Sequence, residues 1–385
     1  MSTKPTASRE IGILVIGFCV LLVFTAGCLM PPDEIGRDIL VFKVDAEGTE
    51  QWQTVIDTGG DDIARTITQT ADGGYLIGGE VWPWRGGRSY GVFKLNSNGT
   101  VDWNVIGEGA SASVVETAIG TIVAVSGSST ESSRTPLFDL TGNLLKSEVQ
   151  SAEAGILESV AGTTDGGVVV VGTFGGDLLV LKKDRNLTEE WRKTYRPTTG
   201  RASEDIIVQT SDGGYLVGSR ISLPDRGGFD VWILRLNATG DLLWDTTLGT
   251  PPLYHDVHFM SEGPESKSTV IYSNIMLGPL EEVVLDPGGN VLEKRALNAS
   301  VPIIKTTGGG YVYAPVTWYC EPRLLIFSDW VGVPHVVKLD PGGLQEWDIE
   351  LNVTFAIGRA VSVIQTTDGG YALLADRYNI PTEPQ

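Results

Sequence analysis

The chain is poor in the residues that most often carry chemistry or covalent cross-links. Its 385 residues include three cysteines and three histidines. Cys19 and Cys28 fall within the first thirty residues, which leaves Cys320 alone in the rest of the chain. No internal disulfide framework is therefore expected, and the small disulfide-stapled folds are excluded.

Basic residues are also scarce. The sequence has 28 Lys and Arg against 48 Asp and Glu, a formal net charge of −20. Nucleic-acid binding needs clustered Lys and Arg, so no nucleic-acid partner is expected. The acidic residues are spread along the chain without forming a run, which is typical of a solvated surface. Adaptation to a salty environment is the alternative explanation.

Common catalytic and metal-binding motifs are missing. The sequence has no Gly-x-Ser-x-Gly, no P-loop, no His-Glu-x-x-His and no Cys-x-x-Cys-His. His255 and His258 are three residues apart, which on a strand points the two rings to opposite faces, and no third ligand is close in sequence. Asp-x-x-Gly turns such as Asp45 to Gly48 lack the dense carboxylates of a Ca²⁺ loop. We therefore predict no metal site and assign no catalytic residue.

The first residues have the plan of an export signal. Lys4 and Arg9 precede an uncharged apolar stretch, and Thr25 to Cys28 resembles a lipobox, in which cleavage before the cysteine leaves its thiol to carry a lipid. We predict a signal peptide over residues 1–27, lipidation at Cys28 and a tether over residues 28–37. The alternative is an uncleaved helix over Ile11 to Met30, which is long enough to cross a bilayer. Either anchor places the rest of the chain outside the cytoplasmic membrane, at the cell surface.

Five Asn-x-Ser/Thr sequons agree with that location and predict a glycoprotein. They begin at Asn98, Asn186, Asn237, Asn298 and Asn352. Turns favour asparagine, glycine and threonine in any case, so turn chemistry is the alternative explanation.

An internal repeat is the most informative feature that is present. Asp-Gly-Gly-Tyr recurs at Asp72, Asp212 and Asp368, each time followed by an apolar strand. A second apolar strand ends near a turn glycine, and a Trp usually stands four residues later, as at Trp52, Trp103, Trp244 and Trp347, with Trp191 following Leu187. Lys146 and Glu293 take this place in the third and sixth units. The strands after the Asp-Gly-Gly turns align at Tyr75, Ile122, Val168, Tyr215, about Val270, Tyr311 and Tyr371, which makes seven units with a period typical of propeller blades.

Strand, turn glycine, three residues and Trp resemble the blade repeat of PQQ-like, quinoprotein-type and WD40-like β-propellers, and the N-terminus resembles prokaryotic, archaeal-like surface lipoproteins. The resemblance implies that the Trp docks against the next blade. Quinone-dependent dehydrogenases of this type commonly carry adjacent cysteines near the cofactor, and this chain has no such pair, so no PQQ cofactor is expected.

We therefore predict an all-β, seven-bladed β-propeller of four-stranded antiparallel blades over residues 38–380, with a tail over residues 381–385. The Asp-Gly-Gly strand is predicted to be the innermost strand of each blade. The chain opens on a predicted second strand at Ile39 and ends on an innermost one at Tyr371 to Ala375. The two chain ends should therefore pair and complete one blade, which removes the exposed edges of an open array.

Function is predicted on the face with the long loops, because a rigid scaffold positions loop side chains. These loops are Glu80 to Arg85, Ser128 to Thr135, Ile221 to Phe229 and Val316 to Pro334. Exposed Trp, Tyr and Arg are common interface anchors, and Trp also stacks on sugar rings. The candidate binding residues are Trp82, Trp84, Arg85, Trp318, Tyr319 and Trp330. The alternative is that these side chains pack over the blade ends.

The sequence thus predicts a lipid-anchored cell-surface module that binds or scaffolds a surface protein or glycan. Two alternatives remain: a propeller enzyme, either a hydrolase or lyase or a degenerate quinoprotein, with a site at the mouth of the central channel, or a structural part of a surface layer.

Overall fold

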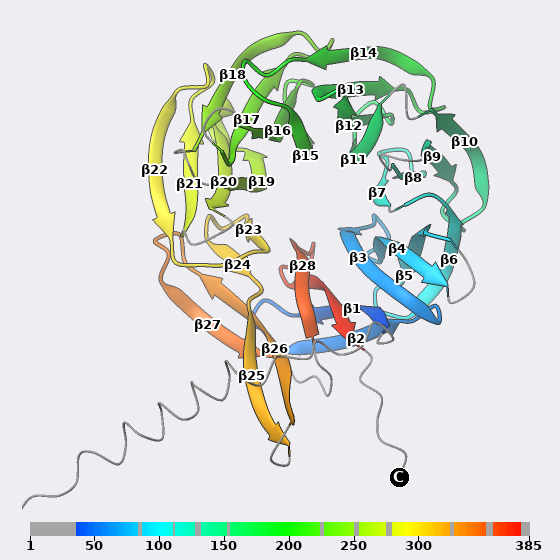
Figure 1. Ribbon diagram of the computed structural model, residues 1–385, viewed down its shortest axis with the longest axis vertical. Coiled ribbons are helices and arrows are strands. Elements are labelled where there is room, and N and C mark those ends of the chain that lie inside the picture. Colours follow the sequence, from blue (N-terminus) through cyan, green and yellow to red (C-terminus); the bar gives the residue numbers. More distant parts are fainter. Residues whose placement is uncertain are drawn as a thin grey trace, which may run out of the picture.

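The computed structural model describes residues 36–83, 87–110, 112–127, 132–151, 155–223, 227–249, 254–274, 279–323, 327–351 and 357–378. These residues form seven antiparallel sheets around one axis, and each sheet is a blade of a β-propeller (Figure 1). Six blades are built from consecutive strands, and one joins the two ends of the described chain. The prediction of an all-β, seven-bladed propeller is confirmed.

We number the blades in chain order, starting with the blade that contains the first strand, and give the strands of each from innermost to outermost. Blade 1 is β28 (Ile357–Gln365), β29 (Tyr371–Tyr378), β1 (Arg37–Val44) and β2 (Glu50–Ile56). Blade 2 is β3 (Gly60–Gln69), β4 (Tyr75–Pro83), β5 (Ser89–Leu95) and β6 (Val101–Glu108). Blade 3 is β7 (Ser113–Glu116), β8 (Ile122–Val125), β9 (Ser133–Phe138) and β10 (Leu144–Gln150). Blade 4 is β11 (Ile156–Gly162), β12 (Val168–Phe174), β13 (Asp177–Lys183) and β14 (Glu189–Tyr195).

Blade 5 is β15 (Ala202–Gln209), β16 (Tyr215–Ser222), β17 (Phe229–Leu236) and β18 (Leu242–Leu248). Blade 6 is β19 (His255–Glu262), β20 (Ser268–Asn274), β21 (Leu280–Leu285) and β22 (Val291–Leu297), with a short 3-10 turn, η2 (Pro264–Ser266), after its first strand. Blade 7 is β23 (Ile303–Lys305), β24 (Tyr311–Tyr313), β26 (Phe327–Leu339) and β27 (Gln345–Glu350). An extra strand, β25 (Val316–Arg323), pairs with the first part of β26.

The predicted order of strands within a blade is wrong by one position. The strand after each Asp-Gly-Gly turn is the second strand of its blade, and the strand predicted as second is the third. The innermost strands are those that precede the turn, such as β3 and β15, and they lie nearest the axis in Figure 1. In blade 6 the second strand begins at Ser268 rather than at about Val270, because Ser268 pairs with Leu285 as Tyr215 pairs with Leu236 in blade 5.

The innermost strands escaped the sequence analysis because their alternation is broken. Five of them carry a β-bulge, for example between Ala64 and Thr66 in β3 and between Leu157 and Ser159 in β11. A bulge inserts an extra residue and shifts the following side chains to the other face. The regular apolar and polar pattern that identifies a strand in a sequence is therefore lost.

The two ends of the described chain close the ring as predicted. β1 pairs with β29 from Arg37 opposite Tyr378 to Val44 opposite Tyr371, and β29 pairs with β28 on its other side. The first two strands thus form the outer half of blade 1, and the last two form its inner half (Figure 1). Lys43 Nζ lies 3.0 Å from an Asp368 oxygen, so an ion pair also joins the two ends.

The apolar core lies between neighbouring blades. The cluster between blades 1 and 2 contains Val41, Ile77 and Phe93, which are almost completely buried, and similar clusters follow around the ring. Third strands such as β1 and β13 are buried along nearly their whole length, since each of their faces meets a neighbouring blade. This explains why these strands read as continuous apolar runs.

The repeated Trp is the wedge between blades that the resemblance implied. The Nε1 atom of Trp52 in blade 1 donates to Ser97 O in blade 2 (3.1 Å), and the indole lies against Gly99. Trp103 and Trp244 make the same contact with the next blade. Two features require glycine at this turn. Its φ is positive, and a Cβ at this position would clash with the indole.

The Asp of the Asp-Gly-Gly turn is held by a basic residue of the third strand in the same blade. Lys94 Nζ lies 2.9 Å from Asp72, and the same pair recurs in blades 1, 4 and 5. Burial opposes ionisation of Asp72, but hydrogen bonds from Thr70, Lys94 and the Gly74 N–H outweigh it and lower the pKa of Asp72 to about 2. The pKa values of Asp165, Asp212 and Asp368 are also lowered to about 2, for Asp212 chiefly by its hydrogen bonds from Arg235.

We expect these turns to make folding stability fall in acid. A folded pKa of about 2 lies below the unfolded value of 3.8, so each carboxylate stabilises the fold above pH 3.8 and loses this effect as the pH falls through 2. Because the carboxylates are largely exposed, each should contribute less than about 1 kcal/mol. In urea unfolding, the stability difference between the parent and an Asp212→Asn variant should be largest near pH 6 and shrink towards pH 2. An equal difference at both pH values would contradict this account.

Candidate functional site

The two faces of the ring differ as the sequence predicted. The Asp-Gly-Gly turns and the turns between third and fourth strands are tight and lie on one face. The connections from second to third strands and from blade to blade lie on the other face, which we call the long-loop face. The longest of these connections is the β25 and β26 hairpin of blade 7, which projects away from the ring (Figure 1).

Trp82 is an exposed aromatic side chain on the long-loop face. It stands near the end of β4, and 44% of its surface is exposed. Its indole Nε1 donates to the Glu80 carboxylate, and the Arg88 guanidinium lies 5.9 Å from the ring centroid. These two contacts fix the plane of the indole, so Trp82 presents a rigid aromatic surface rather than a freely rotating side chain.

Glu80 organises this corner of blade 2. Its side chain is 1% exposed and is bound by Arg88, which donates to both oxygens, and by Arg65 at 3.2 Å. Burial raises the pKa of Glu80, but the hydrogen bonds from Arg88, Trp82 and Arg65 outweigh it and leave the pKa below its usual value. Glu80 is therefore an ionised carboxylate that holds Trp82 and Arg88 in place. Without these hydrogen bonds, burial would favour its protonated form.

The other candidate binding residues are only partly placed. Trp84 and Arg85 lie outside the described residues. The backbones of Trp318 and Tyr319 lie in β25 and that of Trp330 lies in β26, while their side chains are outside the described part of the structure. Blade 1 stands between this hairpin and Trp82, so the two groups of candidates are held on separate blades.

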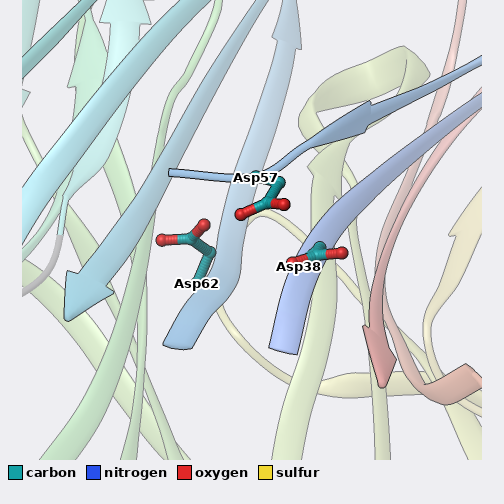
Figure 2. Close-up of side chains that lie close together, drawn as sticks. All are labelled: Asp38, Asp57 and Asp62. Carbon is teal, nitrogen blue, oxygen red and sulfur yellow. The ribbon is translucent and has the colours of Figure 1, made fainter. Parts of the chain in front are cut away.

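Three carboxylates that the sequence analysis did not single out come together at the junction of blades 1 and 2. Figure 2 shows Asp38 of β1, Asp57 after β2 and Asp62 of β3, each with one oxygen within 4.8 Å of the others. Asp57 and Asp62 flank one short turn, but Asp38 comes from the preceding hairpin of blade 1, so no single local motif reveals the group. Carboxylate oxygens are ligands of hard cations such as Ca²⁺ and Mg²⁺.

Protein donors already reach these carboxylates. Arg377 Nη2 lies 2.7 Å from Asp38, the Thr58 N–H and hydroxyl both donate to Asp62 at 2.6 Å, and the Gly59 N–H donates to Asp57. Burial raises the pKa of Asp62 and outweighs the two hydrogen bonds from Thr58. The group can thus serve as a structural junction in which hydrogen bonds and one arginine offset the negative charge.

The histidines have separate partners. His255 Nδ1 lies 3.4 Å from Asp230 in blade 5, whereas His258 Nε2 lies 2.6 Å from the Ser273 hydroxyl in blade 6. Burial lowers the pKa of His258 to about 4, so this imidazole is neutral at pH 7. His335 pairs with Asp348 in blade 7. The three histidines thus take part in three different local contacts.

Two of the sequon asparagines take part in their turns. The side-chain oxygen of Asn98 accepts from the Thr100 N–H and hydroxyl, and that of Asn237 accepts from the Thr239 and Asp241 N–H groups. Asn98, Asn186 and Asn298 are exposed. Asn352 lies outside the described residues. Glycosylation at these positions stays a prediction.

The anchor also stays a prediction. Cys28 and the whole predicted signal segment lie outside the described residues, and among the residues that are described no helix has the length and apolar character needed to span a membrane.

Comparisons with known proteins identify the fold. No protein-family model matches the chain, and no curated protein matches its sequence. A catalytically inactive virginiamycin B lyase from Staphylococcus aureus matches in structure, with 10% identity over 88% of this chain and 99% of that one and a TM-score of 0.51. A protein assigned as a 6-phosphogluconolactonase from Bacteroides uniformis matches with 10% identity over 82% and 97% and a TM-score of 0.51. A quinoprotein alcohol dehydrogenase-like protein from Bacteroides thetaiotaomicron matches with 11% identity over 66% and 59% and a TM-score of 0.41.

These proteins have different activities on one architecture. The likeness to the lyase and to the protein assigned as a lactonase shows the β-propeller fold alone, so the function has to be argued from this chain's own surface.

Proposed function

We propose that this protein is a surface-anchored binding module that recognises a glycan through the long-loop face, with Trp82 as the anchor. The exposed indole, held in one orientation by Glu80 and Arg88, is the observation that carries the proposal. A preorganised aromatic ring binds without first losing rotamer freedom, and its flat face suits the apolar side of a sugar ring. Tethering through a lipid at Cys28 would hold this face outside the membrane.

The carboxylate that holds Trp82 supports binding over bond cleavage. Glu80 is kept ionised by its contacts with Arg65 and Arg88. A glycosidase needs one carboxyl group with a raised pKa to protonate the leaving group. Carboxylates already bound to guanidinium groups are better suited to position neighbouring side chains.

The binding proposal can be tested with a Trp82→Ala variant on immobilised neutral oligosaccharides. Its affinity for a glycan bound by the parent should fall at least about tenfold. Phe174→Ala is the matched control, because Phe174 also stands at the end of a second strand and is 45% exposed; its affinity should stay within about twofold of the parent. Equal affinities for parent and Trp82→Ala would refute the role of Trp82, and capture of a protein by the parent with no glycan bound would point to a protein partner.

A hydrolase is the second candidate, favoured by one pair of residues in blade 6. The Ser273 hydroxyl lies 2.6 Å from the neutral imidazole of His258, the arrangement of a nucleophile and its base. Asp256, whose pKa is raised chiefly by burial, stands opposite Ser273 in the sheet. Hydrolysis of p-nitrophenyl esters that disappears in a Ser273→Ala variant would support this candidate.

A further inference from the structure

The wedge between blades 3 and 4 differs from the others. Lys146 stands where five of the other blades have Trp, and its Nζ donates to Asn186 O in the next blade (2.8 Å), as indoles do at their own wedges. At the turn of blade 4 the usual glycine is replaced by Leu187, which has φ +63° and is 1% exposed. A narrow lysine chain and a buried leucine have thus replaced a broad indole and a glycine.

A cavity of about 440 Å³ lies at this altered wedge. Both blades line it, blade 3 through β9 and β10 and blade 4 through β13 and β14. Its polar lining includes Lys146, Glu148, Gln150, Lys183, Thr188 and Arg192. The volume falls in the range of about 300–1,000 Å³ that is usual for small-ligand sites.

The charge of this cavity is opposite to that of the protein. Its lining holds three basic and two acidic side chains, a net charge of +1, in a chain of net charge −20. Glu148 receives both Lys146 (2.7 Å) and Lys183 (2.6 Å), and these contacts outweigh its burial and lower its pKa. A single carboxylate, Glu148, thus pairs with two ammonium groups, so one positive charge of the pair is not neutralised and could attract an anion.

Lys183 is the most informative of these groups. Its side chain is 7% exposed, and Glu148 is the partner that the described residues give it. An ammonium group has three N–H donors, so Lys183 has further donors for a ligand in the cavity. Glu148 offsets the cost of burying this cation, but Glu148 is shared with Lys146, and an anionic ligand would balance the second ammonium group.

We propose that this cleft binds a small polyhydroxylated carboxylate, of the chemical class of a uronic acid. Lys183 and Lys146 would receive the carboxylate, and the Thr188 hydroxyl would reach a hydroxyl group of the ligand. Arg192 donates to Glu189 and to Gln150 and so holds this side of the cleft in place. The described lining has no aromatic side chain and few apolar ones, which disfavours a nucleobase or a lipid. The cleft lies between blades 3 and 4, whereas Trp82 lies in blade 2. A failure of this proposal would therefore leave the glycan-binding proposal untouched, and the reverse also holds.

The proposal is tested by calorimetric titration of the purified protein with sodium glucuronate, glucose and inorganic phosphate. Glucuronate should bind with a Kd of about 1 mM or tighter, and glucose and phosphate should bind at least about tenfold more weakly. Two variants should each weaken glucuronate binding about tenfold or more. Lys146→Trp with Leu187→Gly restores the repeated wedge and fills the cleft, and Lys183→Gln removes the buried charge.

Lys193→Gln is the control, because Lys193 is on the same strand as Arg192 but pairs with Asp241 of blade 5. It removes one positive charge without touching the cleft and should leave binding unchanged. Restoring the wedge should keep or raise the melting temperature, which separates loss of the site from loss of the fold. If the wedge variant does not fold, Lys183→Gln decides alone. No binding of glucuronate, equal binding of glucose or phosphate, or unchanged affinity in the folded variants would each overturn the proposal.

Discussion

Replacing Gly99 by alanine should destabilise the ring far more than the same change at Gly343. Both glycines occupy the same place in the turn between the third and fourth strands, with φ +85°. A Cβ at Gly99 would lie 2.4 Å from Trp52 Cε3, whereas a Cβ at Gly343 would meet nothing within 4 Å. Gly343→Ala should therefore cost about 1–2 kcal/mol from backbone strain alone. Gly99→Ala should cost about 1–3 kcal/mol more, because the indole must move.

Urea unfolding of the two variants beside the parent measures this difference directly. The matched backbone removes conformational strain from the comparison, so the excess at Gly99 reports the contact between blades. Blade 6 has Glu293 at the place where other blades have the Trp, so no indole fills the space beside Gly343. Arg295 of blade 6 makes the contact with this turn and donates to the Pro341 carbonyl (2.8 Å). Equal losses of stability in Gly99→Ala and Gly343→Ala would show that the contact between Trp52 and Gly99 does not help to hold neighbouring blades in place.

Ending the chain after Gly370 should abolish cooperative folding of the ring. The truncation removes β29, which pairs with β1 on one side and β28 on the other. Leu373 and Leu374 alone are nearly fully buried, and burying each contributes about 1.5–3 kcal/mol, against a typical net stability of about 5–15 kcal/mol. The edges of β1 and β28 would also be left open to pairing with other molecules.

A chain that ends after Tyr378 is the matched control, since it keeps every described residue of β29. Thermal melting followed by circular dichroism should show one sharp transition for the control and none for the shorter chain. A cooperative transition at the control's midpoint in the shorter chain would mean that β29 does not close the ring.

Much of the ring could be predicted because its repeat is local. The Asp-Gly-Gly turn, the buried third strand and the Trp four residues after a turn glycine each reflect contacts made within a few residues or with the next blade. The innermost strands could not be ordered correctly, since bulges such as that between Val257 and Phe259 interrupt their alternation. One contact between blades was also missed: Gln69 accepts from the Thr367 N–H across the closure, and Gln209 accepts from Thr164 in the same way.

In the candidate sites, too, single residues could be predicted from the sequence but their contacts with distant segments could not. Trp82 could be singled out as an aromatic residue in a loop, but the contacts that hold it come from Glu80 and Arg88 and depend on how β4 and β5 pair. Lys146 could be recognised as a departure from the repeat, whereas the cavity beside it needed Lys183 of the next blade.

The number of blades, the wedge residues and the pairing of the chain ends could be predicted from the sequence, because the repeat marks the same strands and turns in successive blades. Which strands face the axis, which charges are buried and where side chains of different blades meet became visible only in the folded chain. Those features depend on contacts between segments far apart in the chain, and the register of strands that sets them is altered by single-residue bulges.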